Sequence, residues 1–561
     1  MKRIVFLIIA TLLVLGLVLP GCGGDEPVDD FDQYITIGIA GPMGQSQGQH
    51  HMYGAELARD EINDDGAGGV TVGGLVYGIK LVEIDTNEVL SPSGVDGLTA
   101  MSAAIGDVDI VMGGFRTEAV LAYRTIAVGP TGADKIFIDC GAATEKLTHD
   151  VVDDYDNYKY WFKGTPPNEL FLSTSNSKLI GMIVGMTTGY KKIVTVNETA
   201  TYEPKVAFIA EDALWTELSR VLTVAKLGPG PGGSDWLVGP SPYVWTPAPV
   251  ATVAAMSVML TEIATYDPEV IITIMSGPVG VTYANLVGDY MPDVLTLGIN
   301  VEAQRVGFPD AAEYAEGMIF LDSWAPGVNL TGTTAAFLDA FETKTDQWPI
   351  YTAATYDALL SLVENIDTAD SLTTAALIPV MEASRYDSAS GTTAYYPLDD
   401  GITTAAHPFG PALGYPATTE ALNEDQVLAL YPWLTSAKYA PYPPTVVNNW
   451  TYNAAQWTML PHTSHDLVYG TEWVTGTASQ WQDVGGDLTK VGVWPKPYLP
   501  GVPTDQATFL GALGMGAFTP VQVYTFQALG LWDQYGWWHF EYEGTGTVDL
   551  VDWWTWLALG W

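Results

Sequence analysis

The 561-residue sequence predicts an α/β protein made of two doubly wound units. Between Ile35 and Thr148, short β-branched runs alternate with helical patterns in a regular series, and the alternation returns between Lys205 and Met275. Strands separated by helices of this length imply right-handed crossovers and a parallel sheet with helices on both faces. In such a sheet, the loops at the carboxyl ends of the strands form the ligand crevice.

The first unit begins with a strand at Ile35–Ala40, which ends at a Gly-Pro turn signal. A helix over residues 50–63 follows, because apolar residues recur there at helical spacing up to a Gly-rich stop. The series continues with strands at Ile79–Asp85, Asp109–Gly114 and Asp134–Cys140, and with helices near Ser93–Ile105 and Glu118–Ala127. The candidate ligand loops are therefore Gly41–Gly48, which contains Gln47, Gly113–Thr117 and Gly141–Thr144.

The second unit repeats the pattern. Its predicted elements are a helix at 168–182, a strand at Lys205–Ala210, helices at Leu214–Leu227 and Val253–Tyr266, and a strand at Glu269–Met275. Helices around Thr334–Thr343 and Thr352–Asn365 follow, and closing strands are expected within Tyr469–Trp494.

The charge of the chain is strongly acidic, with 65 Asp and Glu against 22 Lys and Arg and a formal net charge of −43. Such a chain is repelled by nucleic acid and by anionic lipid head groups, so neither is an expected partner. Because charged residues make up only 16% of the sequence, we interpret the imbalance as a soluble surface rather than an acidic functional patch.

The N-terminus has the order of a lipoprotein signal: basic residues at positions 2 and 3, an apolar run, and "LPGC" ending at Cys22. We expect the mature chain to begin at lipidated Cys22, and the alternative is an uncleaved transmembrane anchor. The other cysteine, Cys140, ends a predicted strand and is expected to be a buried small hydrophobe.

Several motifs, in order, resemble the extracytoplasmic solute-binding proteins of branched-chain amino acid ABC transporters, the leucine-binding type. They are "IGIAGPMG", "YGAELARDEIN", "VMGG", "CGAATEKLT", "YWFKGTPPNE", "VAFIAEDALW", "YTAATYDALLSLVENI" and "QWQDVGGDLTKVGVWPK", and together they cover about Ile35 to Lys496. The resemblance implies a type I periplasmic-binding-protein-like fold, with two doubly wound α/β lobes joined by a multi-strand hinge and irregular, aromatic-rich C-terminal additions.

The resemblance and the sequence patterns together predict the domain boundaries. We expect a signal peptide at 1–21, a tether at 22–34, lobe 1 at 35–155 and 323–390, lobe 2 at 156–322 and 391–500, and a Trp-rich extension at 501–561. The acidic, Tyr-rich run at 149–162 resembles the first crossover, and residues 317–324 resemble the second. The insertion at 408–457 is rich in aromatic residues, which either form a binding surface for sugars or aromatic solutes or pack the segment onto its core.

In lobe 1, the resemblance implies that a ligand carboxylate is held by backbone amides and a hydroxyl at the strand ends, from Gly114, Thr117, Ala142, Ala143 and Thr144. The alternative is that these glycines only make tight turns. Arg116 would add a charge-assisted contact and Glu118 would oppose an anion. Because the family usually has small hydroxyl residues there, this departure argues against an amino-acid ligand.

In lobe 2, the resemblance implies that Trp215 closes over the ligand, that Ser276 and Gly277 form a second loop, and that Glu302 meets a ligand ammonium group. The alternative for Glu302 is a solvated surface residue.

Enzyme chemistry is not expected, because no hydrolase, P-loop or dinucleotide fingerprint occurs in a suitable context. No cofactor is expected either. The segment "EYEGTGTVDLVDWW" resembles a degenerate EF-hand or dockerin loop, with an acidic turn before a helix as the alternative. The candidate calcium ligands would be Glu541, Glu543, Thr545, Asp549 and Asp552.

The expected function is that of a lipid-anchored, monomeric substrate-binding protein on the outer face of the membrane. It would capture an amino acid, amide or small carboxylate by hinge closure and deliver it to ABC permease subunits. The alternatives are a ligand-sensing receptor domain of the same fold, or a surface protein that binds carbohydrates or aromatic compounds.

Overall fold

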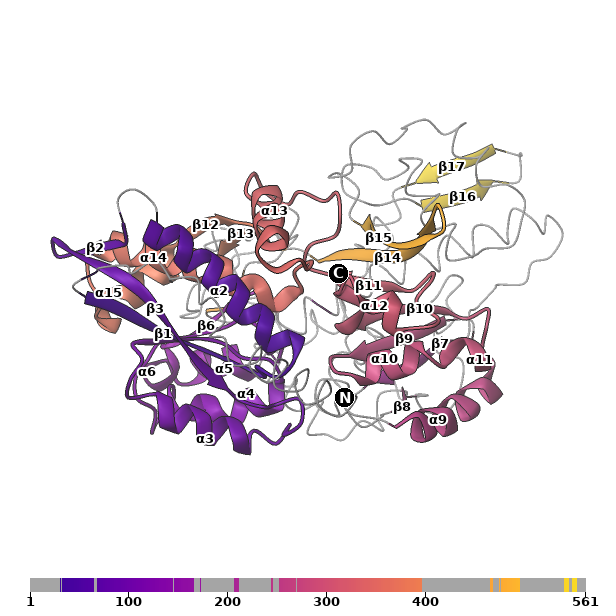
Figure 1. Ribbon diagram of the computed structural model, residues 1–561, viewed down its shortest axis with the longest axis horizontal. Helices are drawn as coiled ribbons and strands as arrows, with labels where there is room; N and C mark the ends of the chain where they lie inside the picture. The colour runs from indigo at the N-terminus through magenta and orange to yellow at the C-terminus, as the bar shows by residue number, and fades with distance from the viewer. Residues whose placement is uncertain are drawn as a thin grey trace, which may run out of the picture.

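Two α/β lobes, each built on its own sheet, lie side by side in the computed structural model (Figure 1). The structure describes residues 31, 33–64, 68–144, 146–165, 172, 206–210, 244–245, 252–268, 270–395, 465–467, 474, 476–494, 539–543 and 547–551. The predicted α/β fold with two doubly wound lobes is confirmed.

The lobe 1 sheet has the strand order β2 (Val70–Val72), β3 (Leu75–Asp85), β1 (Gln33–Gly41), β4 (Ile110–Gly113), β5 (Phe137–Asp139) and β6 (Trp161–Lys163). All neighbours pair in parallel except β2, which pairs antiparallel with β3. The parallel pairing brings the ends of β1, β4 and β5 to one edge of the sheet, so the three candidate ligand loops of lobe 1 emerge together.

Alternating residues along these strands form two separate hydrophobic cores, one on each face of the sheet. On β4, Ile110 and Met112 face one core and Val111 faces the other. The first core is covered by α2 (Ser46–Asp64), α13 (Thr334–Thr345), α14 (Thr355–Ala369) and α15 (Thr374–Ala383). The second is covered by α3 (Val95–Ala104), α4 (Thr117–Tyr123) and α5 (Lys146–Asp153), and Cys140 is fully buried in the first core, as predicted.

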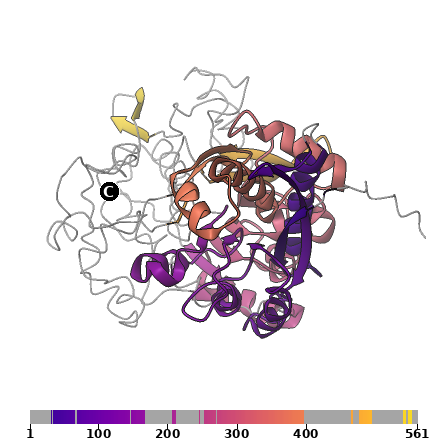
Figure 2. The same cartoon turned by 90° about the vertical axis from the view of Figure 1, so that its left-hand side faces the viewer.

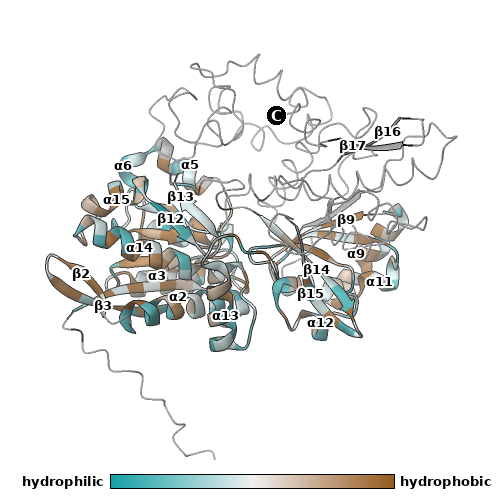
Figure 3. Ribbon diagram, turned by 90° about the horizontal axis from the view of Figure 1, so that it is seen from above, coloured by the Kyte–Doolittle hydropathy of each residue, from teal (hydrophilic) through white to brown (hydrophobic). Residues whose placement is uncertain are grey.

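Segments far apart in the sequence therefore share lobe 1: the N-terminal strands lie in the same lobe as α14 and α15 (Figure 2). Hydrophobic residues run along the strands of both lobes, and hydrophilic residues lie on outer turns of helices such as α13 (Figure 3). None of the helices in the described part of the chain combines the length and apolar character needed to span a membrane.

The lobe 2 sheet has the order β15 (Asp487–Trp494), β14 (Thr477–Val484), β11 (Ile319–Asp322), β10 (Leu295–Asn300), β9 (Val270–Met275), β7 (Val206–Ala210) and β8 (Val244–Trp245). The strands β7 to β11 are parallel, and β14 and β15 add an antiparallel hairpin. Its core packs α9 (Val253–Tyr266), α10 (Val279–Ala284), α11 (Val287–Tyr290) and α12 (Phe308–Ala311) against the sheet. Helix α9 has the predicted bounds and begins where the Thr252 side chain accepts the Ala255 amide at 3.2 Å.

Two crossovers lie elsewhere than predicted. Residues 149–162 do not leave lobe 1, because they form α5, α6 (Tyr155–Tyr158) and most of β6, which pairs with β5. The strands β12 (Arg385–Ser388) and β13 (Gly391–Ala394) form a hairpin that packs on lobe 1. Tyr395, Leu467 and Val474 pack in the core of the same lobe. These three residues therefore belong to lobe 1 rather than to lobe 2, and the next described strand of lobe 2 is β14.

The weak candidate for a calcium loop at 541–552 lies only partly within the described residues and stays a prediction. Residues His539–Glu543 and Thr547–Val551 form the hairpin β16–β17, in which Glu541 pairs directly with Asp549. In an EF-hand these two positions belong to one loop that curls around the ion and leads into a helix. The hairpin instead carries them on opposite strands, and the other candidates, Thr545 and Asp552, lie outside the described residues.

Candidate functional site

A cavity between the lobes lies where the carboxyl ends of both sheets face each other. It encloses about 860 Å³, counted out to the open solvent at its mouth. From lobe 1 it is lined by Phe115, Arg116, Thr117, Gly141, Ala143 and Tyr351, and from lobe 2 by Ser276, Ile299, Val301, Gln304 and Leu321. The remaining described lining residues are Thr165, Leu172, Asp322, Ser323, Ser390 and Gly476. The position agrees with the rule that ligands bind at the carboxyl ends of parallel strands.

The structure brings only part of the predicted site to this cavity. Thr117, Ala143 and Ser276 line it. Gly114, Ala142, Thr144 and Gly277 lie in the same loops but do not line it, and Trp215 lies outside the described residues, so its role stays a prediction. Gln47 and Glu302 bond to each other and do not line the cavity.

Four backbone amides in the candidate ligand loops of lobe 1 donate to side chains of the chain itself. The Arg116 amide donates to Glu88 Oε2 at 2.7 Å, and the amides of Gly141 and Ala142 donate to Asp139 Oδ1 at 3.2 and 2.9 Å. The Ala143 amide donates to Thr117 Oγ1 at 3.2 Å. The amides of Ala142 and Ala143, two of the groups expected to hold a carboxylate, therefore shape the loops in this structure, and the anion site stays a prediction.

Glu88 is a buried carboxyl group beneath the β4–α4 loop that sequence reasoning missed. It also accepts bonds from Thr86 Oγ1 at 2.6 Å and from the Tyr123 hydroxyl at 3.2 Å. Burial raises the pKa of Glu88 to about 7, and the hydrogen bonds oppose the rise. An acid three residues after the end of the strand Leu75–Asp85 was the only signal for it in the sequence.

A second buried network supports the neighbouring loop. Lys163 Nζ donates to Asp139 Oδ2 at 2.6 Å and to the Ala142 carbonyl, with exposed side-chain fractions of 1% for Lys163 and 0% for Asp139. Burial raises the pKa of Asp139, and Lys163 and the two loop amides oppose the rise. Asp139 thus holds β6 and the Gly141–Ala143 loop in one arrangement.

Arg116 reaches across the cavity from lobe 1 to lobe 2, and its side chain is only 3% exposed. Its Nε and Nη2 atoms lie 2.8 and 2.7 Å from Glu118 Oε1, and Nη1 lies 3.5 Å from Ser276 Oγ. The arginine therefore lies where loops of both lobes converge.

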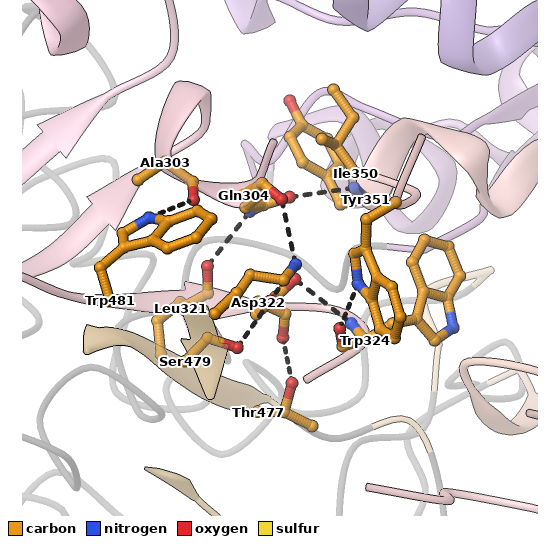
Figure 4. Close-up of polar contacts among 12 residues, drawn as sticks. Ala303, Gln304, Leu321, Asp322, Trp324, Ile350, Tyr351, Thr477, Ser479 and Trp481 are labelled. Atoms are coloured by element: carbon orange, nitrogen blue, oxygen red, sulfur yellow. Dashed lines mark hydrogen bonds and ion pairs between the residues drawn. The ribbon is translucent and has the colours of Figure 1, made fainter. Parts of the chain in front are cut away.

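On the lobe 2 side, Asp322 ends β11 at the start of a crossover (Figure 4). Its carboxylate forms an ion pair with Lys490. Its Oδ2 accepts Lys490 Nζ at 2.9 Å and Ser479 Oγ at 2.8 Å. Burial lowers the pKa of Lys490, and Asp322 opposes the fall. Gln304 Oε1 accepts the Tyr351 amide at 3.1 Å, so this cluster also contacts lobe 1.

Gln47 and Glu302 form a second contact between the lobes. Gln47 Nε2 donates to Glu302 Oε1 at 2.8 Å and to the Ser276 carbonyl at 3.1 Å, and Arg305 Nη1 lies 2.9 Å from Glu302 Oε2. The lobes are therefore in direct contact, and Glu302 serves their contact rather than lining the cavity.

The histidines on α2 are structural. Burial lowers the pKa of His50 and of His51 to about 4, so both are neutral at pH 7. His50 accepts the Ile350 amide at Nδ1, and His51 Nε2 lies 3.0 Å from the Gly114 carbonyl. Among the described residues, no three His, Cys, Asp or Glu side chains gather as a metal site.

Two doubly wound lobes, crossovers after β6, after β11 and before β14, and a cavity at the facing strand ends define the type I periplasmic-binding-protein fold. The substrate-binding protein LivJ of a branched-chain amino acid transporter from Streptococcus pneumoniae, solved with isoleucine, shares this fold. It is 16% identical, with a TM-score of 0.52 over 82% of this chain and 100% of that chain.

A proposed branched-chain amino acid ABC transporter protein from Silicibacter pomeroyi is similar as well. It is 17% identical, with a TM-score of 0.52 over 84% of this chain and 98% of that chain. No family model matches the sequence, and no curated protein matches it. At these identities the likeness establishes the fold.

Proposed function

We propose that this chain is a lipid-anchored extracytoplasmic receptor that captures a small polar solute between its lobes and delivers it to the permease subunits of an ABC importer. The observation that carries the proposal is the cavity, because strand-end loops of both lobes line it. A solute that contacts both lobes stabilises the closed arrangement over the open one. The Streptococcus pneumoniae protein of the same fold, a transporter substrate-binding protein in complex with isoleucine, supports this reading.

Binding is tested by thermal shift and calorimetry on the mature protein with a panel of amino acids, amides and small carboxylates. At least one compound is expected to raise Tm, because a ligand at about 100 times its Kd stabilises the native state by about 2.7 kcal/mol. If no member of the panel binds the folded protein, the solute-receptor function is wrong.

A glycine pair tests whether that binding occurs in this cavity. Gly141→Ala should abolish it, because the new Cβ would overlap the Gly114 carbonyl and push the two ligand loops apart. Gly106→Ala is the matched control, since a Cβ there meets nothing within 4 Å, and it should bind like the native protein. If a folded Gly141→Ala variant binds with native affinity, the ligand does not bind in this cavity.

The lipid anchor rests on the order of basic, apolar and "LPGC" segments at the N-terminus. Cys22→Ser should prevent acylation and either release the protein or leave the precursor unprocessed. Membrane fractionation and the mass of the N-terminal peptide measure this. Unchanged retention and unchanged mass would contradict the anchor and favour an uncleaved membrane segment.

A further inference from the structure

The β2–β3 hairpin lies at the end of lobe 1 that points away from lobe 2 (Figure 1). Its turn is Gly73–Gly74, and the next two residues carry exposed apolar side chains, Leu75 at 51% and Val76 at 42%. The sequence has no charged residue between Asp65 and Lys80, although the whole chain carries 65 acidic residues. An exposed apolar turn on so acidic a protein indicates a contact with another surface.

Two aromatic rings continue the apolar surface where the chain enters β1. Phe31 and Tyr34 pack edge to face with ring centroids 5.9 Å apart, and Tyr34 is 39% exposed. Tyr34 lies opposite Gly78 on β3, so it shares a face of the sheet with Val76, which is two residues before Gly78. Tyrosine rings, with an apolar body and a polar hydroxyl, are typical of the boundary between water and lipid.

The N-terminal segment points to a lipid surface as the partner of this hairpin patch, which consists of Tyr34, Leu75 and Val76. Strands β1 and β3 are parallel, so the turn before β3 lies at the sheet edge where β1 begins. Cys22, the residue proposed to carry lipid, is nine residues before Phe31, and a chain of that length spans at most about 30 Å. The anchor would therefore hold the membrane near this edge, whereas the cavity lies at the opposite edge, where the strands end.

The charge of the protein selects the kind of lipid surface. A net charge of −43 is repelled by anionic head groups, so apolar contact with a zwitterionic surface is the available driving force. The Asp370 carboxylate accepts the Gly73 amide at 2.6 Å, which places one acidic group at the turn. The turn therefore suits the depth of the head groups, because deeper insertion would carry this charge into hydrocarbon.

We propose that the β2–β3 turn docks on the zwitterionic lipid surface of the membrane and holds lobe 1 there at head-group depth. The inference rests on the membrane attachment proposed above and adds an orientation to it. The edge of lobe 1 where the strands begin faces the membrane, and the cavity stays clear of it. Docking through one lobe leaves the hinge free to open and close.

A fluorescent label tests the contact on the acylated protein, bound to phosphatidylcholine vesicles that contain a spin-labelled lipid. Cys22 is blocked by its lipid and Cys140 is fully buried, so the label attaches at Leu75→Cys alone. Its emission should shift to shorter wavelength and lose intensity through quenching by the spin label. Val258→Cys is the control, at a residue that is 72% exposed on α9 of lobe 2, and it should show neither change.

The mass of the N-terminal peptide separates this inference from the anchor. An acylated, vesicle-bound protein without quenching at position 75 would overturn the inference and leave the anchor standing. A protein that is not acylated and stays in solution would overturn both. A wavelength shift that rises with protein density, without quenching by the spin-labelled lipid, would assign the hairpin patch to a second copy of this chain and overturn the inference as well.

Paired charge variants assign the contact to the apolar side chains. With the label moved to Thr71→Cys, an exposed position on β2, Leu75→Asp with Val76→Asp should reduce the quenching about fivefold or more, because carboxylates replace the groups that enter lipid. Val253→Asp with Val258→Asp on α9 adds the same charge and should leave the quenching unchanged. Melting of each variant shows whether it is folded. Native quenching in the folded Leu75→Asp, Val76→Asp variant would contradict the proposed contact.

Discussion

Replacement of Lys163 by methionine is expected to destabilise lobe 1 by about 3–5 kcal/mol, because it leaves a buried carboxylate without its cation. The ammonium group lies 2.6 Å from Asp139 Oδ2, and both side chains are buried. The same ammonium group also bonds the Ala142 carbonyl, so the ligand loop loses a support at the same time. Urea unfolding, followed by a probe in lobe 1, measures the loss.

Two comparisons isolate the cause. The double variant Lys163→Met with Asp139→Asn should recover much of the stability, since the cost lies in the unpaired charge rather than in the missing ion pair. Lys159→Met removes a partly exposed lysine that lies 3.8 Å from Asp156, and it should cost less than about 1 kcal/mol. A Lys163→Met variant within about 1 kcal/mol of the native protein would show that Asp139 is neutral or solvated in the native state.

The sequence predicted the fold well where periodicity and turn signals are local. Alternating isoleucines on β1 indicated a strand, and the capped apolar run 253–266 indicated a helix, and both are present. The crossovers were harder to predict. A stretch with helical and strand-like patterns, such as 149–163, has the same sequence pattern whether it completes one lobe or connects to the other. Only the pairing of β6 with β5 decides this, and pairing between distant strands has no local signal.

The candidate site was predicted only in part, because local patterns locate its loops but contacts between distant residues have no local signal. The strand-end loops were correct in position, and Thr117, Ala143 and Ser276 line the cavity. What the sequence could not predict is how the polar groups of these loops are used. Glu88 accepts the amide of Arg116, which lies 28 residues later in the sequence. Asp139 accepts the amides that lie two and three residues after it. Glu302 was assigned to the ligand from the family resemblance, yet in the structure it binds Gln47, which is 255 residues away in the sequence.

Replacement of Lys490 by methionine is expected both to destabilise lobe 2 and to change what the cavity binds. Lys490 is 4% exposed and lies 2.9 Å from Asp322 Oδ2, so its removal should cost about 3–5 kcal/mol for the carboxylate left behind. It also donates to the Gln304 carbonyl at 3.0 Å, beside the amide contact that Gln304 makes with Tyr351 of lobe 1. Denaturant unfolding of lobe 2 measures the first effect.

The second effect follows from the position of Asp322 on the cavity wall. With Lys490 gone, its negative charge is no longer balanced, so a bound carboxylate should weaken and a ligand with an ammonium group should gain affinity relative to it. Calorimetry of a carboxylic acid and its α-amino acid, such as 3-phenylpropanoate and L-phenylalanine, on the Lys490→Met variant measures the change in the ratio of their affinities. Lys490→Met with Asp322→Asn should restore both the stability and the native ratio, because it removes the two charges together. If the ratio stays at its native value in the folded single variant, Asp322 is too far from the ligand to take part in its selection.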